Sequence, residues 1–173
     1  NCKILYQTGK GYGDALINGI KNLDTEFFCI FNADGSFNPI ELKSMYNNIQ
    51  QNNIDFIFAS RYEKDCSSED DTIITKIGNF IFTKIGKIIF KLKITDILYT
   101  FVMGKSERAK ALNLKSKDFS FCVELPIKAS KKNYKLSTSK SKERSRIAGK
   151  KKVNAIKDGT LILISMFKLF FEN

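Results

Sequence analysis

Two short apolar runs, separated by one helical pattern, constrain the fold of this chain most strongly. Residues 27–31 read Phe-Phe-Cys-Ile-Phe, and residues 55–60 read Asp-Phe-Ile-Phe-Ala-Ser. Between them, residues 39–51 begin with Pro39 directly after Asn38, which is a helix start with Asn38 as N-cap. Strands and helices that alternate in this way are typical of βαβ units. We therefore expect an α/β fold with a mostly parallel sheet and flanking helices.

An acidic turn at residues 32–36, Asn-Ala-Asp-Gly-Ser, follows the first apolar run directly. It lies at the carboxyl end of the expected strand, where open α/β sheets bind their ligands. A carboxylate at Asp34, with further oxygen donors at Asn32 and Ser36, can hold a hard divalent cation that keeps room for substrate phosphates. The alternative is that Asp34 only caps the turn.

The pattern before and after this core extends the alternation. We expect a strand at residues 3–7, followed by a Gly-rich turn at 9–13 that opens a helix to about residue 22. Residues 62–71 form a polar loop that is long enough to be a lid over a site.

Residues 72–93 carry isoleucine and phenylalanine at intervals of three and four, which predicts a helix. Two interpretations stay open: a helix that packs on the core with a solvated basic face, or a helix on a membrane surface. After it we expect a strand at 97–103, a helix at 121–130, a strand at 134–138 and a final helix from 153 to about 171.

The net charge of +11 is concentrated in one part of the chain. Residues 105–157 contain 17 of the 29 Lys and Arg residues but only four of the 18 Asp and Glu residues. Such an excess suits nucleic acid, an anionic membrane surface or a phosphorylated substrate, and a lysine-rich composition without functional meaning explains part of it. A nucleic-acid-binding module is disfavoured, because the lysines gather in one loop and no strand interleaves aromatic with basic residues.

Cysteine and histidine usage excludes several classes of chemistry. The four cysteines show no paired spacing, which favours buried free thiols in a reducing compartment. The absence of histidine excludes Ser-His and Cys-His nucleophiles and His-ligated zinc. The longest apolar run, residues 161–171, is interrupted by Lys168 and is too short to span a bilayer. We therefore expect a cytoplasmic protein, with a peripheral position at the cytoplasmic membrane face as an open alternative.

Five short segments follow one another in a characteristic order. They are Gly-Lys-Gly-Tyr-Gly at 9–13, Phe-Asn-Ala-Asp-Gly-Ser-Phe-Asn-Pro at 31–39, Ala-Ser-Arg-Tyr at 59–62, Thr-Asp at 95–96, and Arg-x-x-Gly-x-x-Lys at 146–152. No segment is specific alone. In this order and spacing they resemble family 2 glycosyltransferases, and among these the dolichyl- or polyprenyl-phosphate sugar transferases, over most of the chain.

This resemblance implies a GT-A (Rossmann-like) fold and the transfer of a sugar from a nucleotide-sugar donor to an acceptor, such as a dolichyl or polyprenyl phosphate. A growing glycan or polysaccharide is the alternative acceptor. Mg²⁺ or Mn²⁺ is the implied cofactor. The first Asp of the family's Asp-Ala-Asp is Asn32 here, and the Ser of its terminal motif is Lys151. We therefore expect weaker metal binding rather than its loss.

The family begins with a strand, a helix and a strand that bind the nucleotide base, and only a middle strand of that half matches the start of this chain. We therefore interpret residues 1–173 as an N-terminally truncated fragment of a single glycosyltransferase domain. Residues 1–104 would form the sheet core with the metal and donor site. Residues 105–173 would form the acceptor-side helices and the basic loop at residues 139–152. A non-catalytic remnant is the further alternative.

The resemblance also suggests roles for single residues on the donor side. Gly9, Lys10 and Arg61 would bind the donor, and the planar fork of Arg61, which follows a strand end, suits a phosphate. Arg61 and Asp96 are the candidate catalytic residues. Asp96 would act as a general base or would orient the acceptor.

On the acceptor side, Arg146, Gly149 and Lys152 would bind the acceptor phosphate, since glycine lets the backbone approach an anion. The expected partners are a nucleotide-sugar donor, a lipid-phosphate or glycan acceptor and a peripheral membrane surface, without nucleic acid.

Overall fold

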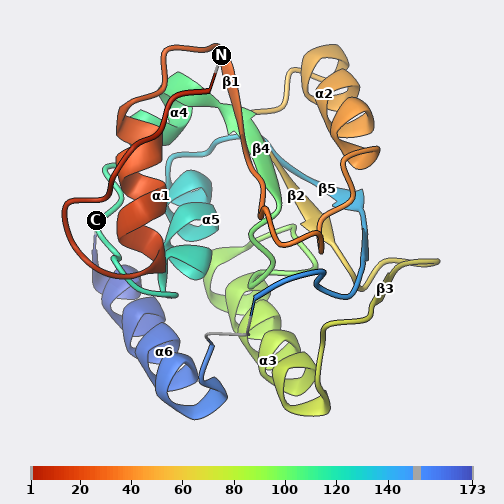
Figure 1. The fold of residues 1–173 in the computed structure, drawn as a ribbon. Helices are drawn as coiled ribbons and strands as arrows, with labels where there is room; N and C mark the ends of the chain where they lie inside the picture. The colour runs from red at the N-terminus through yellow and green to blue at the C-terminus, as the bar shows by residue number, and fades with distance from the viewer. Residues whose placement is uncertain (1, 150–152, 173) are drawn as a thin grey trace.

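The computed structural model describes residues 2–149 and 153–172, which form a mixed sheet with helices on both faces (Figure 1). The four-stranded sheet has the order β1-β4-β2-β5 and consists of β1 (Phe27–Ile30), β2 (Phe56–Ser60), β4 (Val102–Lys105) and β5 (Leu136–Lys140). A separate parallel pair is formed by β3 (Ser67–Ser68) and β6 (Lys142–Glu143). The sheet therefore combines strands from both ends of the chain in one unit.

The helices divide between the two faces of this sheet. They are α1 (Tyr12–Lys21), α2 (Glu41–Gln51), α3 (Ile73–Phe90), α4 (Ser106–Ala111), α5 (Phe121–Lys131) and α6 (Ala155–Phe171). Helix α2 lies on one side, and α1, α3, α5 and α6 lie on the other (Figure 1). The predicted helices are thus confirmed to within a few residues at their ends, where helix assignments commonly vary.

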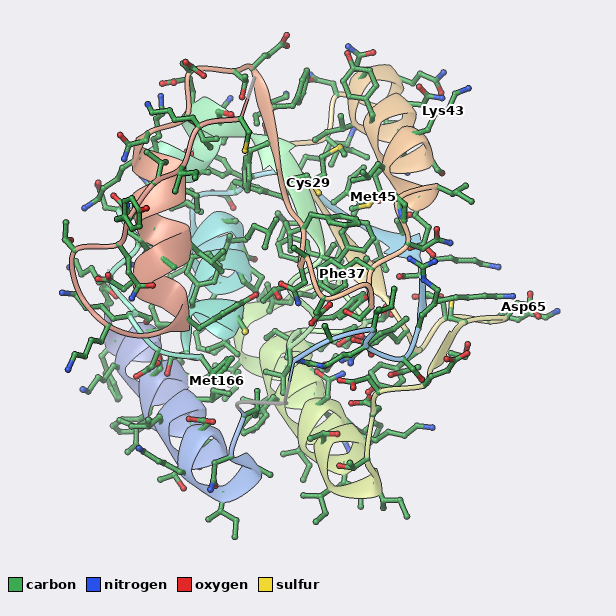
Figure 2. The ribbon with its side chains drawn as sticks, in the orientation of Figure 1. Cys29, Phe37, Lys43, Met45, Asp65 and Met166 are labelled. Atoms are coloured by element: carbon green, nitrogen blue, oxygen red, sulfur yellow. The ribbon has the colours of Figure 1, made fainter. Side chains whose placement is uncertain are left out.

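Helices can cover both faces of the sheet because the side chains along each strand point alternately into two hydrophobic cores. Phe56 and Phe58 of β2 pack with the larger cluster under α1, α5 and α6. Ile57 of the same strand packs with the smaller cluster, which contains Phe37 and Met45 next to α2 (Figure 2). Strands buried on both faces read as nearly continuous apolar runs, as the sequence pattern indicated.

The expectation of a mostly parallel sheet is wrong, because β4 runs antiparallel to both of its neighbours. Within the described four-stranded sheet, only β2 and β5 pair in parallel. An apolar pattern gives the period of a strand but neither its direction nor its neighbour, so β4 could not be placed from the sequence. Gly104 of β4 lies between Phe28 and Phe56, where a Cβ atom would overlap the Phe56 ring. The glycine therefore lets Phe28 of β1 and Phe56 of β2 pack against each other across β4.

The strand expected at residues 3–7 is also absent. These residues are extended without pairing, and Ile4 and Tyr6 are 72% and 84% exposed. The backbone of Tyr6 accepts a hydrogen bond from the Asn18 side chain at 3.0 Å, in place of a strand partner. An apolar run becomes a strand only where a neighbouring edge takes up its backbone groups, and among the described residues no edge does so here.

Candidate functional site

A cavity of about 420 Å³ lies at the carboxyl ends of β1 and β2. Its charged lining comes from four segments and consists of Asp34, Arg61, Asp70, Asp71, Glu143 and Arg146. Asn32 and Gly149 also line it. The structure thus brings together residues from the acidic turn, the end of β2, the polar loop and the basic loop. This is the edge at which open α/β sheets bind ligands.

The carboxylate of Asp34 is held by its own turn. Its Oδ1 accepts hydrogen bonds from the Ser36 N–H at 3.0 Å and the Ser36 hydroxyl at 2.7 Å. Partial burial pushes the pKa of Asp34 upward, but these two hydrogen bonds and the charge of Arg146 outweigh it and hold the pKa below its ordinary value. Asp34 is therefore ionised at neutral pH. Ser36 is buried, and its hydroxyl orients the carboxylate.

Arg146 lies between two carboxylates. Its Nη1 is 3.4 Å from Asp34 Oδ2, and its Nη2 donates to Asp70 Oδ2 at 3.1 Å. Its Nε donates to both Asp70 oxygens at 3.2 Å. Hydrogen bonding to Asp70, followed by the charges of Asp70 and Asp34, raises the pKa of Arg146 against the effect of burial. The residue predicted to bind acceptor phosphate is thus paired with the residue predicted to bind metal.

Arg61, which also lines the cavity, belongs to a denser network of charged groups. Its Nε and Nη2 donate to the two oxygens of Asp96 at 2.7 and 3.0 Å, and its Nη1 donates to Glu143 at 3.1 Å. Nη1 is also 3.4 Å from Asp71, and the guanidinium stacks 4.5 Å from the Tyr99 ring centroid. Burial lowers the pKa of Arg61, but Asp96, Glu143 and Asp71 outweigh it and raise the pKa well above its ordinary value.

Asp96 has no side-chain surface open to solvent. Besides Arg61, it accepts a hydrogen bond from Asn79 of α3 at 2.8 Å. A general base must reach the proton that it removes. The contacts of Asp96 therefore favour the orienting role among the two roles that the sequence left open.

Gly9 and Lys10 do not line the cavity. The Gly9 N–H donates to Asp14 at 2.9 Å, which fixes the start of α1, and Lys10 is exposed. Their assignment to the donor remains a prediction. Gly149 does line the cavity and has a φ of 87°, a conformation that favours glycine. Lys152 lies outside the described residues.

Sequence reasoning missed Asp70, Asp71, Glu143 and Tyr12 as lining residues. The three acids lie in loops or in the short strand β6, where charged residues usually face solvent. One signal was available for Asp70 and Asp71, since they end the loop interpreted as a lid. Tyr12, which follows the Gly-rich turn, donates to or accepts from Thr100 at 2.6 Å and stacks on Phe119.

The oxygen atoms that line the cavity fit a magnesium ion that is bound partly by the protein and partly by substrate phosphates. Among residues 2–149 and 153–172, no group of three or more Asp, Glu, Cys or His side chains forms a metal cage. However, the charged lining contains four carboxylates and two guanidinium groups, so the cavity has excess negative charge. Mg²⁺ is commonly bound by one or two carboxylates together with substrate phosphates and water. Asp34 with the amide of Asn32 fits that manner of binding.

Comparisons with solved structures agree with this fold. Crystal structures of glucosyl-3-phosphoglycerate synthase from Mycobacterium tuberculosis match with TM-scores of 0.71 for one structure of the enzyme and 0.68 for its complex with Mn²⁺, UDP and phosphoglyceric acid. Sequence identity is 9% in both, and the matches cover 95% and 97% of this chain. The chain spans 57% of the length of these structures. A further complex of that enzyme contains Mg²⁺ and UDP and matches with a TM-score of 0.68 at 9% identity, over 93% of this chain and 55% of that one.

No curated protein matches the sequence significantly. The sequence model of the family Glycosyl transferase family 2 matches residues 1–112, which include the acidic turn, Arg61 and Asp96. Since this match covers more than half of the 173 residues, the chain belongs to glycosyl transferase family 2.

Proposed function

We propose that this protein takes part in the transfer of a sugar from a nucleotide-sugar donor to an acceptor that carries a phosphate. The observation that carries the proposal is the cavity at the ends of β1 and β2, where Asp34 and Arg146 meet. The carboxylate of Asp34 suits the cation that accompanies a nucleotide diphosphate, and the guanidinium of Arg146 suits an acceptor phosphate. Family membership and the UDP complexes of the matching enzyme support the donor class.

On the donor side, Asp34 and Asn32 would hold Mg²⁺ or Mn²⁺. When bound, the cation would neutralise the charge that develops on the leaving diphosphate. Ser36 contributes by fixing Asp34 Oδ1, so that Oδ2 is the oxygen directed away from the turn and toward Arg146. The single carboxylate in the turn makes metal affinity depend strongly on the donor phosphates.

On the acceptor side, Arg146, Gly149 and Lys152 would receive the phosphate. Asp96 and Arg61 act as positioning residues, because their buried pair joins the end of β2 to the segment that follows α3. An acceptor that is already an ionised phosphate needs no strong base, which agrees with the enclosed position of Asp96.

Exposed apolar side chains support a lipid acceptor at a membrane surface. Helices α3 and α6 lie side by side (Figure 1). Their large apolar side chains on the surface are Ile73, Ile74, Ile77, Phe80, Ile81, Ile88, Ile89, Ile156, Leu163, Ile164, Phe167, Phe170 and Phe171. Five exposed lysines accompany them, whereas α3 has no acidic residue and Asp158 of α6 is buried. None of the helices in the described part of the chain is long and apolar enough to cross a membrane.

The transfer assay that tests the proposal offers UDP- and GDP-sugars with Mn²⁺ to the protein and three acceptors. These are a polyprenyl phosphate, phosphoglyceric acid and a neutral oligosaccharide. We expect transfer to the polyprenyl phosphate. Transfer to phosphoglyceric acid alone would support an acceptor-phosphate site but contradict a lipid acceptor. Transfer to the oligosaccharide alone would favour the glycan-extending alternative.

Arg146→Ala and Lys152→Ala are each expected to lower kcat/KM for a phosphate-bearing acceptor by about one to two decades, since a charge-assisted hydrogen bond contributes roughly 1.5–3 kcal/mol. Affinity for the nucleotide sugar should change much less. The measurement is steady-state kinetics of each variant with a polyprenyl phosphate and with a neutral sugar. Equal losses on both acceptors would mean that the basic loop is structural or binds the donor.

Vesicles that contain phosphatidylserine are expected to bind the protein in a salt-sensitive way, because lysines near an anionic surface add attraction that ions screen. Phe80→Glu or Phe167→Glu should weaken binding about tenfold to a hundredfold, since burial of a Phe side chain contributes roughly 1.5–3 kcal/mol. Ile40→Glu is the matched control, because Ile40 is 80% exposed next to α2, on the other side of the sheet. Co-sedimentation that responds equally to all three variants would argue against a membrane-binding α3–α6 surface.

A further inference from the structure

Residues 144–149, which we call the strap, lie across the acidic turn. The Arg144 N–H donates to the Ser36 carbonyl at 3.0 Å, and the Ile147 N–H donates to the Asp34 carbonyl at 2.8 Å. A Cβ atom on Gly35 would lie 2.6 Å from Ile147 Cδ1, and Gly35 has a φ of 86°. The turn therefore has a glycine where the strap passes over it.

The strap places Arg146 at the position expected for a cation. Its guanidinium holds Asp70 with Nε and Nη2, which leaves Nη1 for Asp34 at 3.4 Å. Asp34 and Asp70 are exposed to a similar extent, 20% and 19%, so solvent contact does not separate the two pairs. Asp70 accepts three hydrogen bonds from Arg146 at 3.1–3.2 Å, whereas the ion pair with Asp34 is 3.4 Å long. The contact with Asp70 is therefore the firmer of the two, and the contact with Asp34 is the one that can be exchanged.

The other guanidinium of the cavity cannot replace Arg146 there. Arg61 is buried and is engaged by Asp96, Glu143 and Asp71. Within the described lining, Arg146 is therefore the group that balances the charge of Asp34. A divalent cation and a guanidinium repel each other and compete for the same oxygen.

We propose that Arg146 is the resident counter-ion of Asp34 and exchanges with a divalent cation when the donor site is loaded. The incoming cation takes Asp34 Oδ2, and Arg146 keeps Asp70 while its Nη1 is released into the cavity. The freed Nη1 then becomes available for the acceptor phosphate, a step that rests on the proposed function. Loading of the donor site would in this way precede completion of the acceptor site.

The exchange is tested by titrating the protein with Mn²⁺ alone and measuring free Mn²⁺ by electron paramagnetic resonance. Arg146→Ala is expected to bind Mn²⁺ about three- to tenfold more tightly than the unmodified protein, the range that loss of one partly exposed competing ion pair allows. Arg146→Met, which keeps the length of the side chain without its charge, serves as a second variant and should behave in the same way.

Arg144→Ala is the matched control. It removes the same charge from the same strap, but the Arg144 guanidinium donates to the Phe37 carbonyl at 2.8 Å and does not line the cavity. Its Mn²⁺ affinity should match that of the unmodified protein. If Arg144→Ala raised the Mn²⁺ affinity as much as Arg146→Ala, the effect would come from net charge and the exchange would be rejected. Unchanged or weaker Mn²⁺ binding in both Arg146 variants would also overturn the exchange. Since the titration needs neither donor nor acceptor, tighter binding without sugar transfer would uphold the exchange and reject the proposed function.

Discussion

Asp34→Asn is expected to lower kcat/KM for sugar transfer by at least about a hundredfold. Asp34 is the only carboxylate of the turn at the end of β1, and its replacement removes the charge that would hold the cation. Loss of a Lewis-acid contact costs several kcal/mol, and each 1.4 kcal/mol or so is a factor of ten in rate. The measurement is transfer at increasing Mn²⁺ concentration, in which the variant should stay inactive where the unmodified protein saturates.

Asp65→Asn is the matched control for this loss of one carboxylate. Asp65 has a side chain that is 71% exposed and points away from the body of the molecule (Figure 2). Its φ of 68° is a conformation that asparagine tolerates. Asn32→Asp, which restores a second charge to the turn, should keep or raise activity. Full activity of Asp34→Asn would refute the assignment of the site.

Arg61→Ala is expected to lower the free energy of unfolding by about 3–5 kcal/mol, the usual cost of removing one partner of a buried ion pair. The substitution leaves the enclosed Asp96 without its bidentate partner and brings three carboxylates together without the central cation. Urea unfolding, monitored by circular dichroism, measures the change. Arg61→Lys should recover only part of the loss, because an ammonium group cannot donate in two parallel directions to Asp96.

The control for Arg61 is Arg108→Ala. Arg108 also pairs with an aspartate, Asp55 at 3.4 Å, and lies over the ring of Tyr134, but its side chain is 50% exposed. We expect a cost of about 1 kcal/mol or less there, as for exposed ion pairs. A similar small cost for Arg61→Ala would mean that the desolvation penalty of the buried guanidinium cancels its attraction to the three carboxylates.

Local signals predicted local features well. The runs at 27–31 and 55–60 became β1 and β2 because their alternation satisfied two cores at once. Helix α3 begins at Ile73, next to the start expected at residue 72, and the Thr72 side chain caps it by accepting from the Thr75 N–H. The N-cap expected at Asn38 is wrong, because α2 begins at Glu41 with Ile40 as its N-cap, and Asn38 Oδ1 accepts from the Ile40 N–H in the turn before it. In each case the interactions that decide the structure lie within a few residues.

Features that depend on distant partners could not be predicted. The partners of Arg61 are Asp96 and Glu143, which lie 35 and 82 residues away, and its assignment to the donor phosphate stays a prediction. Asp70 was treated as part of a polar loop, because nothing near it in the sequence indicates Arg146. The direction of β4 likewise depends on its pairing with β1 and β2, whose residues lie 44 to 78 positions before their partners. The charged partners of each residue in this cavity therefore depend on contacts between distant segments of the chain, which a short sequence motif does not contain.

The position of β4 has a consequence for how the chain acquires its structure during synthesis. β1 and β2 do not pair with each other, and β4 lies between them in the sheet. During synthesis, β1 and β2 can pair with β4 only after residues 102–105 have followed α3 out of the ribosome. Unpaired apolar strands of this kind associate readily with other chains. Until residues 102–105 are available, β1 and β2 therefore lack the strand that joins them, and the chain is most open to association with other chains in that interval.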